Sequence, residues 1–252
     1  MSTLDPILIV LHQETSTPGR VGRKLRERGY DLDIRRPPLG CALPETLELH
    51  SGAVIFGGPM SAYDDAPHLI TETNWIDVPL REEKPLLGLC LGAQLMAQHL
   101  GGEVKPDPQG RVEVGYYPIQ PTPEGEALIH WPDMVYQWHQ DGFDLPSGAT
   151  RLASADGPFP EQAFQVGRSA FGLQFHPELT FAMLYRWTVK GAERMLAPGA
   201  QSREAHIEGR LRYDGAVDVW LDAFLDLWLD DAMKPEAKTH PADTLTGIVA
   251  AE

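Results

Sequence analysis

Cysteine is scarce in this chain, which has only Cys41 and Cys90 among its 252 residues. Two cysteines cannot supply the disulfide framework of a small secreted protein, and their number fits a reducing compartment. The length and the apolar fraction of 42% are enough for a sizeable hydrophobic core without disulfides or a structural metal. Cys41 has no base paired with it in the sequence, so we expect it to be structural rather than reactive.

Positive charge is scarce as well. The 21 lysines and arginines are outnumbered by 36 aspartates and glutamates, which gives a formal charge of -15. Tight binding to nucleic acid or to anionic lipid needs clustered basic side chains. We therefore expect neither nucleic acid nor a membrane among the partners, although backbone N–H groups could still bind a small anion.

Long hydrophobic runs and cofactor motifs are also missing. The first apolar run, residues 7–11, is too short for a secretory signal, and no run reaches the roughly 18 residues of a membrane span. We expect a cytoplasmic protein. No Walker A loop and no metal-ligand spacing of histidines occurs, so we expect no cofactor and no metal. The histidines expected to be surface or packing residues include His12, His50, His68, His99, His130 and His206.

The pattern that is present alternates short apolar runs with amphipathic segments. Strands separated by helices predict a mostly parallel sheet with helices on both faces, an α/β fold. From residue 103 to residue 175, short strands with Gly and Pro turns resemble hairpins instead, and residues 178–196 are predicted to be helical. The four early predicted strands are residues 7–11, 30–34, 53–56 and 85–89.

Residues 213–229 have an apolar stripe and an opposite acidic face, which predicts an amphipathic helix. This helix can pack on the main domain or serve as a docking or dimer helix. We expect a main domain over residues 1–197, a helical extension over 198–233 that packs on it, and a flexible tail over 234–252. The stripe is Val217, Trp220, Leu221, Phe224, Leu225 and Trp228, and the acidic face is Asp218, Asp222, Asp226 and Asp230.

A candidate nucleophile lies in residues 88–92, with the sequence Gly-Leu-Cys-Leu-Gly between a predicted strand and a predicted helix. Flanking glycines relieve crowding on such a tight bend. The N-terminus of the helix directs its positive dipole end at the sulfur of Cys90, which favours the reactive thiolate. The alternative is a buried structural cysteine beside two packing glycines.

A base and its orienting group occur together in the segment Phe-His-Pro-Glu at residues 175–178. A thiolate nucleophile needs a base to move protons, and His176 after a predicted strand can point into the cleft above the sheet. Glu178 can return to the imidazole and fix its tautomer. The alternative is a loop histidine before a helix with an acidic first turn.

A third element is the loop Gly57-Gly58-Pro59 after the third predicted strand. Glycine allows backbone N–H groups to approach a ligand, so the N–H of Gly58, together with that of Leu91, could stabilise an oxyanion. An ordinary tight turn is the alternative. All three elements follow strands, and a parallel sheet places its active site at the carboxyl ends of its strands.

Together, residues 54–59, 88–94 and 175–178 resemble the motifs of class I glutamine amidotransferases, in particular the glutaminase domain of GMP synthase and its stand-alone relatives. The resemblance implies a flavodoxin-like three-layer α/β/α fold. It also implies a triad of Cys90, His176 and Glu178 that cleaves the amide of glutamine through a γ-glutamyl thioester and releases ammonia. The oxyanion would lie against Gly58 and Leu91, and Gly57 and Gln94 would bind substrate.

Weaker matches and departures accompany this resemblance. Residues 111–116 resemble the family's strand that lines the glutamine pocket. Residues 135–141 lie where GMP synthases carry a segment ending in His-Gly-Asp, with Gln140 in place of the glycine, and His139 is expected to be a structural or pocket-wall residue. The phosphate-gripping loop of an ATP-pyrophosphatase domain does not occur in the sequence.

Three functions remain open from the sequence. The protein can be a glutamine-hydrolysing subunit that feeds ammonia to a separate synthase partner. It can also be a free-standing hydrolase of another γ-glutamyl compound, because the glutamyl end and the scissile carbonyl are the same. A non-catalytic binding or regulatory relative is the third function, which the presence of Cys90, His176 and Glu178 disfavours.

Overall fold

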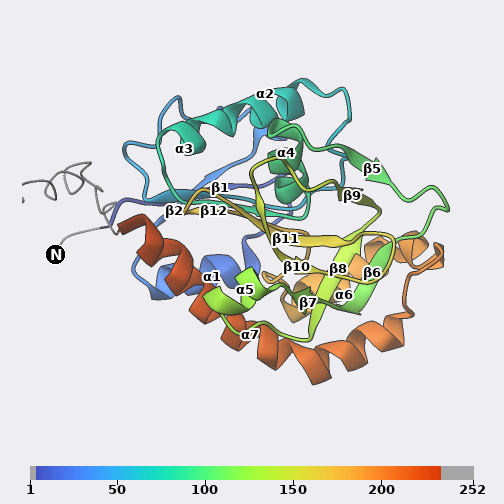
Figure 1. Ribbon diagram of the computed structural model, residues 1–252. Coiled ribbons are helices and arrows are strands. Elements are labelled where there is room, and N and C mark those ends of the chain that lie inside the picture. The colour runs from blue at the N-terminus through green and yellow to red at the C-terminus, as the bar shows by residue number, and fades with distance from the viewer. Residues whose placement is uncertain (1–3, 234–252) are drawn as a thin grey trace, which may run out of the picture.

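The computed structural model describes residues 4–233 and is built on one large mixed sheet (Figure 1). Its strand order is β2-β1-β3-β4-β12-β11-β10-β7. The pairs from β2 to β12 are parallel and the remaining pairs are antiparallel. The strands are β1 (Ile7–Val10), β2 (Leu32–Arg35), β3 (Gly52–Ile55), β4 (Leu86–Leu89), β7 (Gln120–Pro121), β10 (Thr150–Ser154), β11 (Glu161–Val166) and β12 (Ala170–Leu173).

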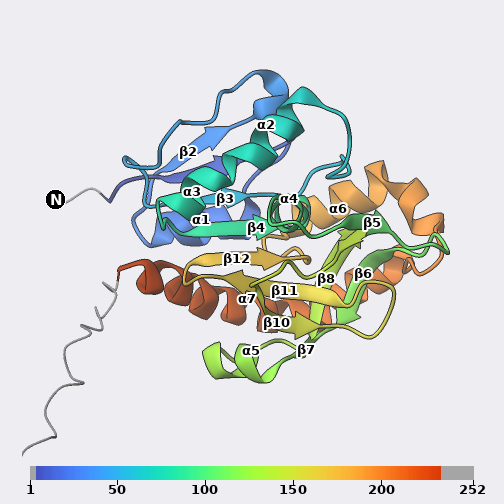
Figure 2. The same ribbon diagram turned by 45° about the horizontal axis from the view of Figure 1, so that its top comes forward.

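Helices cover both faces of this sheet. Figure 2 shows α2 and α3 on one side and α7 on the other. The first strand explains this arrangement: Ile7 and Ile9 belong to the core under α1 and α7, whereas Leu8 and Val10 belong to the core under α2 and α4. The helices are α1 (Gly19–Glu27), α2 (Pro67–Trp75), α3 (Asp77–Arg81), α4 (Leu91–His99), α5 (Pro123–Leu128), α6 (Phe181–Lys190) and α7 (Arg203–Met233), with short 3₁₀ turns at Pro37–Leu39 and Ala192–Leu196.

The predicted three-layer α/β/α fold with a mostly parallel sheet and a C-terminal helix is confirmed. The change to hairpin-like strands after residue 103 appears as two antiparallel ribbons outside the main sheet. One ribbon pairs β5 (Val104–Pro106) with β9 (Asp141–Phe143), and the other pairs β6 (Glu113–Pro118) with β8 (Met134–His139). The second ribbon packs against α7 and carries Trp138 and His139 at one end.

The helix predicted over residues 178–196 begins three residues later and is interrupted. Thr180 caps α6 by accepting a hydrogen bond from the Met183 N–H, and Gly191 separates α6 from a short 3₁₀ turn. The residues before the cap form a turn in which the Leu179 N–H donates to the His176 carbonyl. Non-helical backbone at residues 176–179 lets Glu178 approach His176.

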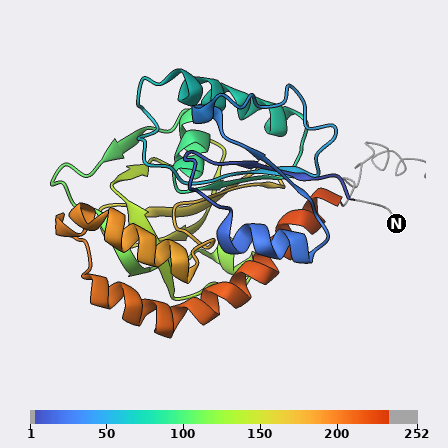
Figure 3. The same ribbon diagram turned by 180° about the vertical axis from the view of Figure 1, so that it is seen from behind.

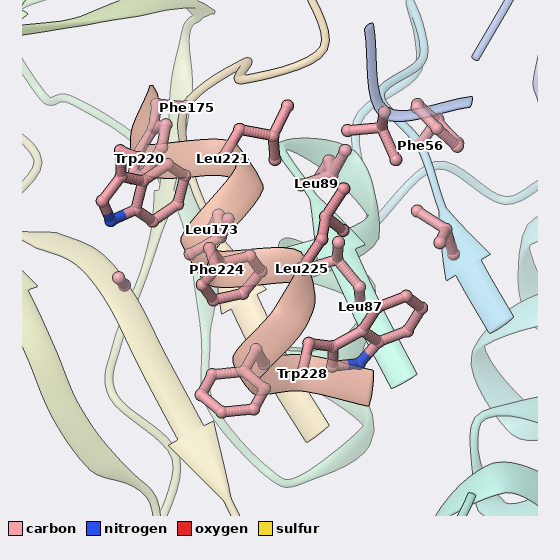
Figure 4. Close-up of a cluster of buried hydrophobic side chains, with 14 of the residues drawn as sticks. Phe56, Leu87, Leu89, Leu173, Phe175, Trp220, Leu221, Phe224, Leu225 and Trp228 are labelled. Carbon is pink, nitrogen blue, oxygen red and sulfur yellow. The ribbon is translucent and has the colours of Figure 1, made fainter. Parts of the chain in front are cut away.

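The C-terminal helix α7 spans 31 residues and is part of the main core. Its apolar stripe lies against the parallel strands: Figure 4 shows Trp220, Phe224 and Trp228 facing the side chains of Leu87 and Leu173. The Trp228 side chain is completely buried, and its indole N–H donates to the Ser169 carbonyl at 3.2 Å. The apolar stripe of this helix therefore packs within the protein itself.

The acidic face of α7 lies beside α1, as Figure 3 shows from behind. Lys24 is almost fully buried, and its ammonium is 2.5 Å from Asp222 and 3.2 Å from Asp218. Arg28 contacts Asp222 and Asp226 in the next turn. These contacts form an interhelical ion-pair network, the α1–α7 clasp, made by Arg20, Arg23, Lys24 and Arg28 with Asp214, Asp218, Asp222 and Asp226.

Among residues 4–233, no helix combines the length and the apolar character needed to cross a bilayer. The predicted tail over residues 234–252 lies outside the described residues. Cys41, which we expected to be structural, is exposed.

Candidate active site

Cys90 lies on the sharp turn between β4 and α4, with φ 51° and ψ -107°. A positive φ is rare and strained for a residue with a side chain, and such strain is typical of functional positions. The turn is held because the Cys90 N–H donates to the Leu173 carbonyl at 2.8 Å, while a Cβ at Gly92 would lie 2.1 Å from the Ile55 oxygen. The helix can begin this close to β3 only with glycine there, and its N-terminus then points at the sulfur.

His176 and Glu178 form a buried pair beside this turn. The imidazole Nδ1 is 2.7 Å from a Glu178 carboxylate oxygen, and both side chains are nearly inaccessible. An ionised carboxylate only accepts, so Nδ1 carries the hydrogen. The other nitrogen, Nε2, is buried and has no hydrogen-bond partner among the described residues. It is therefore the nitrogen available for proton transfer.

The charges around His176 favour the imidazolium form. Burial alone would lower its pKa, but the nearby charges of Glu178 and of the Cys90 thiolate raise the pKa to about 10. An imidazolium in turn stabilises a thiolate next to it. Cys90 lines the same cavity as His176.

The glycine loop after β3 lies directly against these groups. A Cβ at Gly57 would be 2.9 Å from the His176 ring and 3.5 Å from Cys90 Cβ, so a larger residue would press on both. A Cβ at Gly58 would be 2.8 Å from the Leu91 side chain. In the described part of the chain, the N–H groups of Gly58 and Leu91 have no hydrogen-bond acceptor. Both donors are available for a ligand.

Gln94 lines a small cavity that also includes Cys90, Leu91 and Gly58. The side chain is buried, and its amide nitrogen donates to the Asp141 carbonyl at 2.9 Å and to Gln174 at 3.2 Å. Fixed amide groups of this kind orient a polar ligand. His176 is absent from the lining of this cavity.

A larger cavity of about 350 Å³ also borders Cys90 and includes His176 and Glu178. Trp138 and Trp187 contribute aromatic walls, and α6 and the 3₁₀ turn after it contribute basic side chains. These are Arg186, Lys190 and Arg194, none of which has a carboxylate within ion-pair distance in the described part of the chain. One acidic residue of the same turn, Glu193, also lines this cavity.

His139 lines the small cavity and is absent from the lining of the large one. Both imidazole nitrogens of His139 are engaged, one with Glu113 at 3.1 Å and the other with the Asp141 carbonyl at 2.9 Å. Gln140, the departure from the family pattern, lines the small cavity. Residues 111–116 line neither cavity, and Glu113 contacts His139 and the Gln162 amide instead.

Sequence analysis missed His12, which was expected to be a surface or packing residue. It is buried directly behind the glycine loop, between the Gly57 carbonyl and Glu72. Glu72 is 60 residues further along the chain, so no local spacing could have revealed the pair. The basic lining of the large cavity was missed for the same reason.

The chain resembles known proteins over most of its length. The family model "Glutamine amidotransferase class-I" matches residues 13–183. A glutamine amidotransferase-like protein of Salmonella typhimurium, YfeJ, is 32% identical over 68% of this chain and 74% of its own length. The GMP synthase of Aeropyrum pernix is 30% identical over 71% of this chain, which spans only 35% of that enzyme.

Solved structures show the same fold along nearly the whole chain. A glutamine amidotransferase of Methylobacillus flagellatus matches with a TM-score of 0.84 and 25% identity, covering 94% of this chain and 99% of that one. One from Thermotoga maritima matches with a TM-score of 0.81 and 30% identity, covering 91% of this chain and 100% of that one. The protein therefore belongs to the class I glutamine amidotransferase family.

Proposed function

We propose that this protein hydrolyses the γ-amide of glutamine through a γ-glutamyl thioester on Cys90 and releases ammonia. The observation that carries the proposal is the buried His176–Glu178 pair beside a cysteine held at positive φ at a helix N-terminus. Such a pair supplies a nucleophile, a proton carrier and an orienting carboxylate. A free and exposed Cys41 fits a reducing compartment, so we place the protein in the cytoplasm.

In the first stage the Cys90 thiolate attacks the amide carbon and a C–S bond forms. The carbonyl oxygen gains negative charge, which the N–H groups of Gly58 and Leu91 stabilise. His176 then gives its Nε2 proton to the amide nitrogen, the C–N bond breaks, and ammonia leaves. Glu178 keeps the imidazole in the required tautomer throughout.

In the second stage water replaces ammonia next to His176. The neutral imidazole takes a proton from water, and the hydroxide attacks the thioester carbon. The C–S bond breaks, glutamate leaves, and Cys90 returns to the thiolate opposite a protonated His176. The glutamyl end lies against Gln94, which lines the small cavity, and against the backbone of Gly57, which lines the large cavity. No step requires a metal or a cofactor.

The ammonia is proposed to pass to a separate synthase subunit. Relatives named GMP synthase support this, but the chain spans about a third of their length, and its sequence has no phosphate-gripping loop for acceptor activation. In this proposal the synthase partner carries out the acceptor reaction.

A second candidate function is favoured by the large cavity. The leaving group must lie on the side of His176, because His176 protonates it, and the cavity there is far larger than ammonia requires. Its aromatic walls and the cations Arg186, Lys190 and Arg194 suit a larger, acidic amine. The protein would then be a free-standing hydrolase of γ-glutamyl compounds such as γ-glutamyl amino acids.

Glutamate release by the purified protein tests both candidates. The substrates are glutamine, γ-glutamyl amides of neutral amines, and γ-glutamyl amino acids, with Cys90→Ala as the inactive control. Preference for acidic leaving groups that falls in Arg186→Gln and Arg194→Gln, but not in the distant and exposed Arg168→Gln, would establish the second candidate. Slow turnover of glutamine alone would support the amidotransferase subunit. An inert protein whose Cys90 does not react with a glutamine-like electrophile would contradict both.

A further inference from the structure

Another buried histidine–glutamate pair lies behind the glycine loop. His12 follows β1, and its Nδ1 is 3.2 Å from the Gly57 carbonyl oxygen. Its Nε2 is 2.9 Å from Glu72, which reaches it from α2 on the opposite face of the sheet from α7. Both side chains are completely inaccessible to solvent. Burying two ionisable groups is costly, so the pair calls for an explanation beyond packing.

The hydrogen-bond pattern fixes which nitrogen of His12 is a donor. A carbonyl oxygen only accepts, so Nδ1 must carry a hydrogen directed at Gly57. Glu72 is compatible with this whether it is ionised and accepts from Nε2–H, or protonated and donates to Nε2. In both arrangements Glu72 is hydrogen-bonded to Nε2 of His12, and the Nδ1–H donates to the Gly57 carbonyl oxygen.

The acceptor belongs to the peptide bond whose other end is the Gly58 N–H. In a trans peptide the C=O and N–H point in opposite directions, so a donor that anchors the Gly57 oxygen also sets where the Gly58 N–H points. Two glycines have no side chains to hold this peptide, and glycine backbone has the widest choice of conformations. A hydrogen bond from outside the loop can therefore fix the orientation of the Gly57–Gly58 peptide.

We propose that His12 is a positioning residue for the oxyanion hole, and that Glu72 holds His12 in the required tautomer. This role of His12 rests on the proposed function, because an oxyanion donor is needed only if an acyl oxyanion forms at Cys90. The His12 bond keeps the Gly58 N–H directed at that oxyanion and polarises the peptide, which strengthens the donor. In this proposal two histidine–glutamate pairs serve the reaction directly: His176–Glu178 moves protons, and His12–Glu72 holds the oxyanion donor.

His12→Asn and His12→Gln provide a matched test. An asparagine amide lies near the position of Nδ1 and keeps a donor for the Gly57 oxygen, whereas a glutamine amide lies near Nε2 and keeps only the Glu72 contact. Each is assayed for kcat and KM with the substrate that the wild type turns over. Alkylation of Cys90 by iodoacetamide, which forms no oxyanion, is measured in a Cys41→Ser background because Cys41 is exposed.

We expect kcat of His12→Gln to fall about 10- to 100-fold, below the loss for removing a direct oxyanion donor, with KM changed less than about 3-fold. His12→Asn should stay within about 5-fold of wild type. Alkylation of Cys90 should be unchanged in both. The control is His50→Gln, another buried histidine paired with a carboxylate, Asp33, but lining neither cavity; it should be unaffected.

Equal kcat in His12→Gln and wild type would overturn the inference, as would equal losses in His12→Asn and His12→Gln. A parallel fall of alkylation and turnover would also overturn it, because that pattern means general damage to the site. If the wild type hydrolyses no γ-glutamyl substrate, the proposed function fails, and the inference fails with it. An active wild type with an unaffected His12→Gln overturns the inference alone.

Discussion

At the scale of single residues, Cys90 is held in a conformation that few residues adopt. Its φ of 51° places the sulfur above the carboxyl ends of β4 and β12, where the helix dipole and His176 both favour thiolate. We predict that Cys90→Ala abolishes glutamate release while leaving circular dichroism and the thermal midpoint close to wild type. Measurable turnover by this variant would contradict thioester chemistry.

In the proposed mechanism the carboxylate of Glu178 orients His176 and does not itself perform the chemistry. Because Glu178 helps to hold the pKa of His176 at about 10, Glu178→Gln should lower that pKa. We predict a partial loss of kcat, about 10- to 100-fold. The alkaline limb of the kcat/KM profile, near pH 10 in the wild type, should move to lower pH. If the alkaline limb does not move in Glu178→Gln, a group other than His176 determines its position.

The sequence predicted these residues because each lies directly after an apolar strand. Cys90 and His176 follow neighbouring parallel strands, so local pattern alone places both at one edge of the sheet. The 2.7 Å contact of Glu178 also follows from a short turn. His12 and Glu72 show no such pattern, since their pairing depends on how α2 packs across the sheet.

At the scale of elements, the α1–α7 clasp connects an early helix to a late one. Lys24 is nearly buried and depends on Asp222 and Asp218 for its neutralisation. We predict that Asp222→Ala lowers the free energy of unfolding by about 1–2 kcal/mol, because Lys24 loses one partner and keeps the other. Chemical denaturation with circular dichroism measures this.

Asp230 is the matched control for that change. It lies on the same acidic face and is exposed, and within residues 4–233 no cation lies within ion-pair distance of it. Asp230→Ala should change stability by less than about 0.5 kcal/mol. Equal effects of the two substitutions would show that the clasp acts through general charge and not through specific pairs.

Acid should weaken the clasp in a definite direction. Burial opposes ionisation of Asp222, but Lys24 and Arg28 outweigh it and lower its pKa below the usual 3.8. The contribution of ionised Asp222 to the free energy of unfolding is therefore complete above about pH 4, and it is lost as the pH falls through the lowered pKa.

Helix α7 itself was predictable from its apolar stripe. The partner of its acidic face was not, because α1 lies about 190 residues earlier.

At the scale of the whole molecule, α7 and the parallel strands share one core. Trp228, Phe224 and Trp220 lie against β4 and β12, so the helix forms part of the layer that covers this face (Figure 4). We predict that Trp228→Ala costs about 3–5 kcal/mol, as for other buried aromatic truncations. Exposed Val219→Ala on the same helix is the control and should cost less than about 1 kcal/mol.

Unfolding should also be a single transition. If α7 is part of the core, circular dichroism and tryptophan fluorescence should report the same midpoint. Separate midpoints would show that α7 melts independently of the sheet.

The layered fold was predictable because strand and helix periods alternate clearly. The boundary at residue 197 stays a prediction, and the placement of the β6–β8 ribbon beside α7 depends on contacts that no local pattern specifies.

The position of α7 has a consequence for synthesis on the ribosome. Strands β1, β3 and β4 emerge early, yet the helix that covers much of one face of them emerges more than 100 residues later. A nascent chain therefore carries an uncovered apolar surface made by residues such as Ile9, Val54 and Leu87 while translation continues. We expect the half-made protein to be open to chaperones or to non-specific collapse until completion of α7 closes its core.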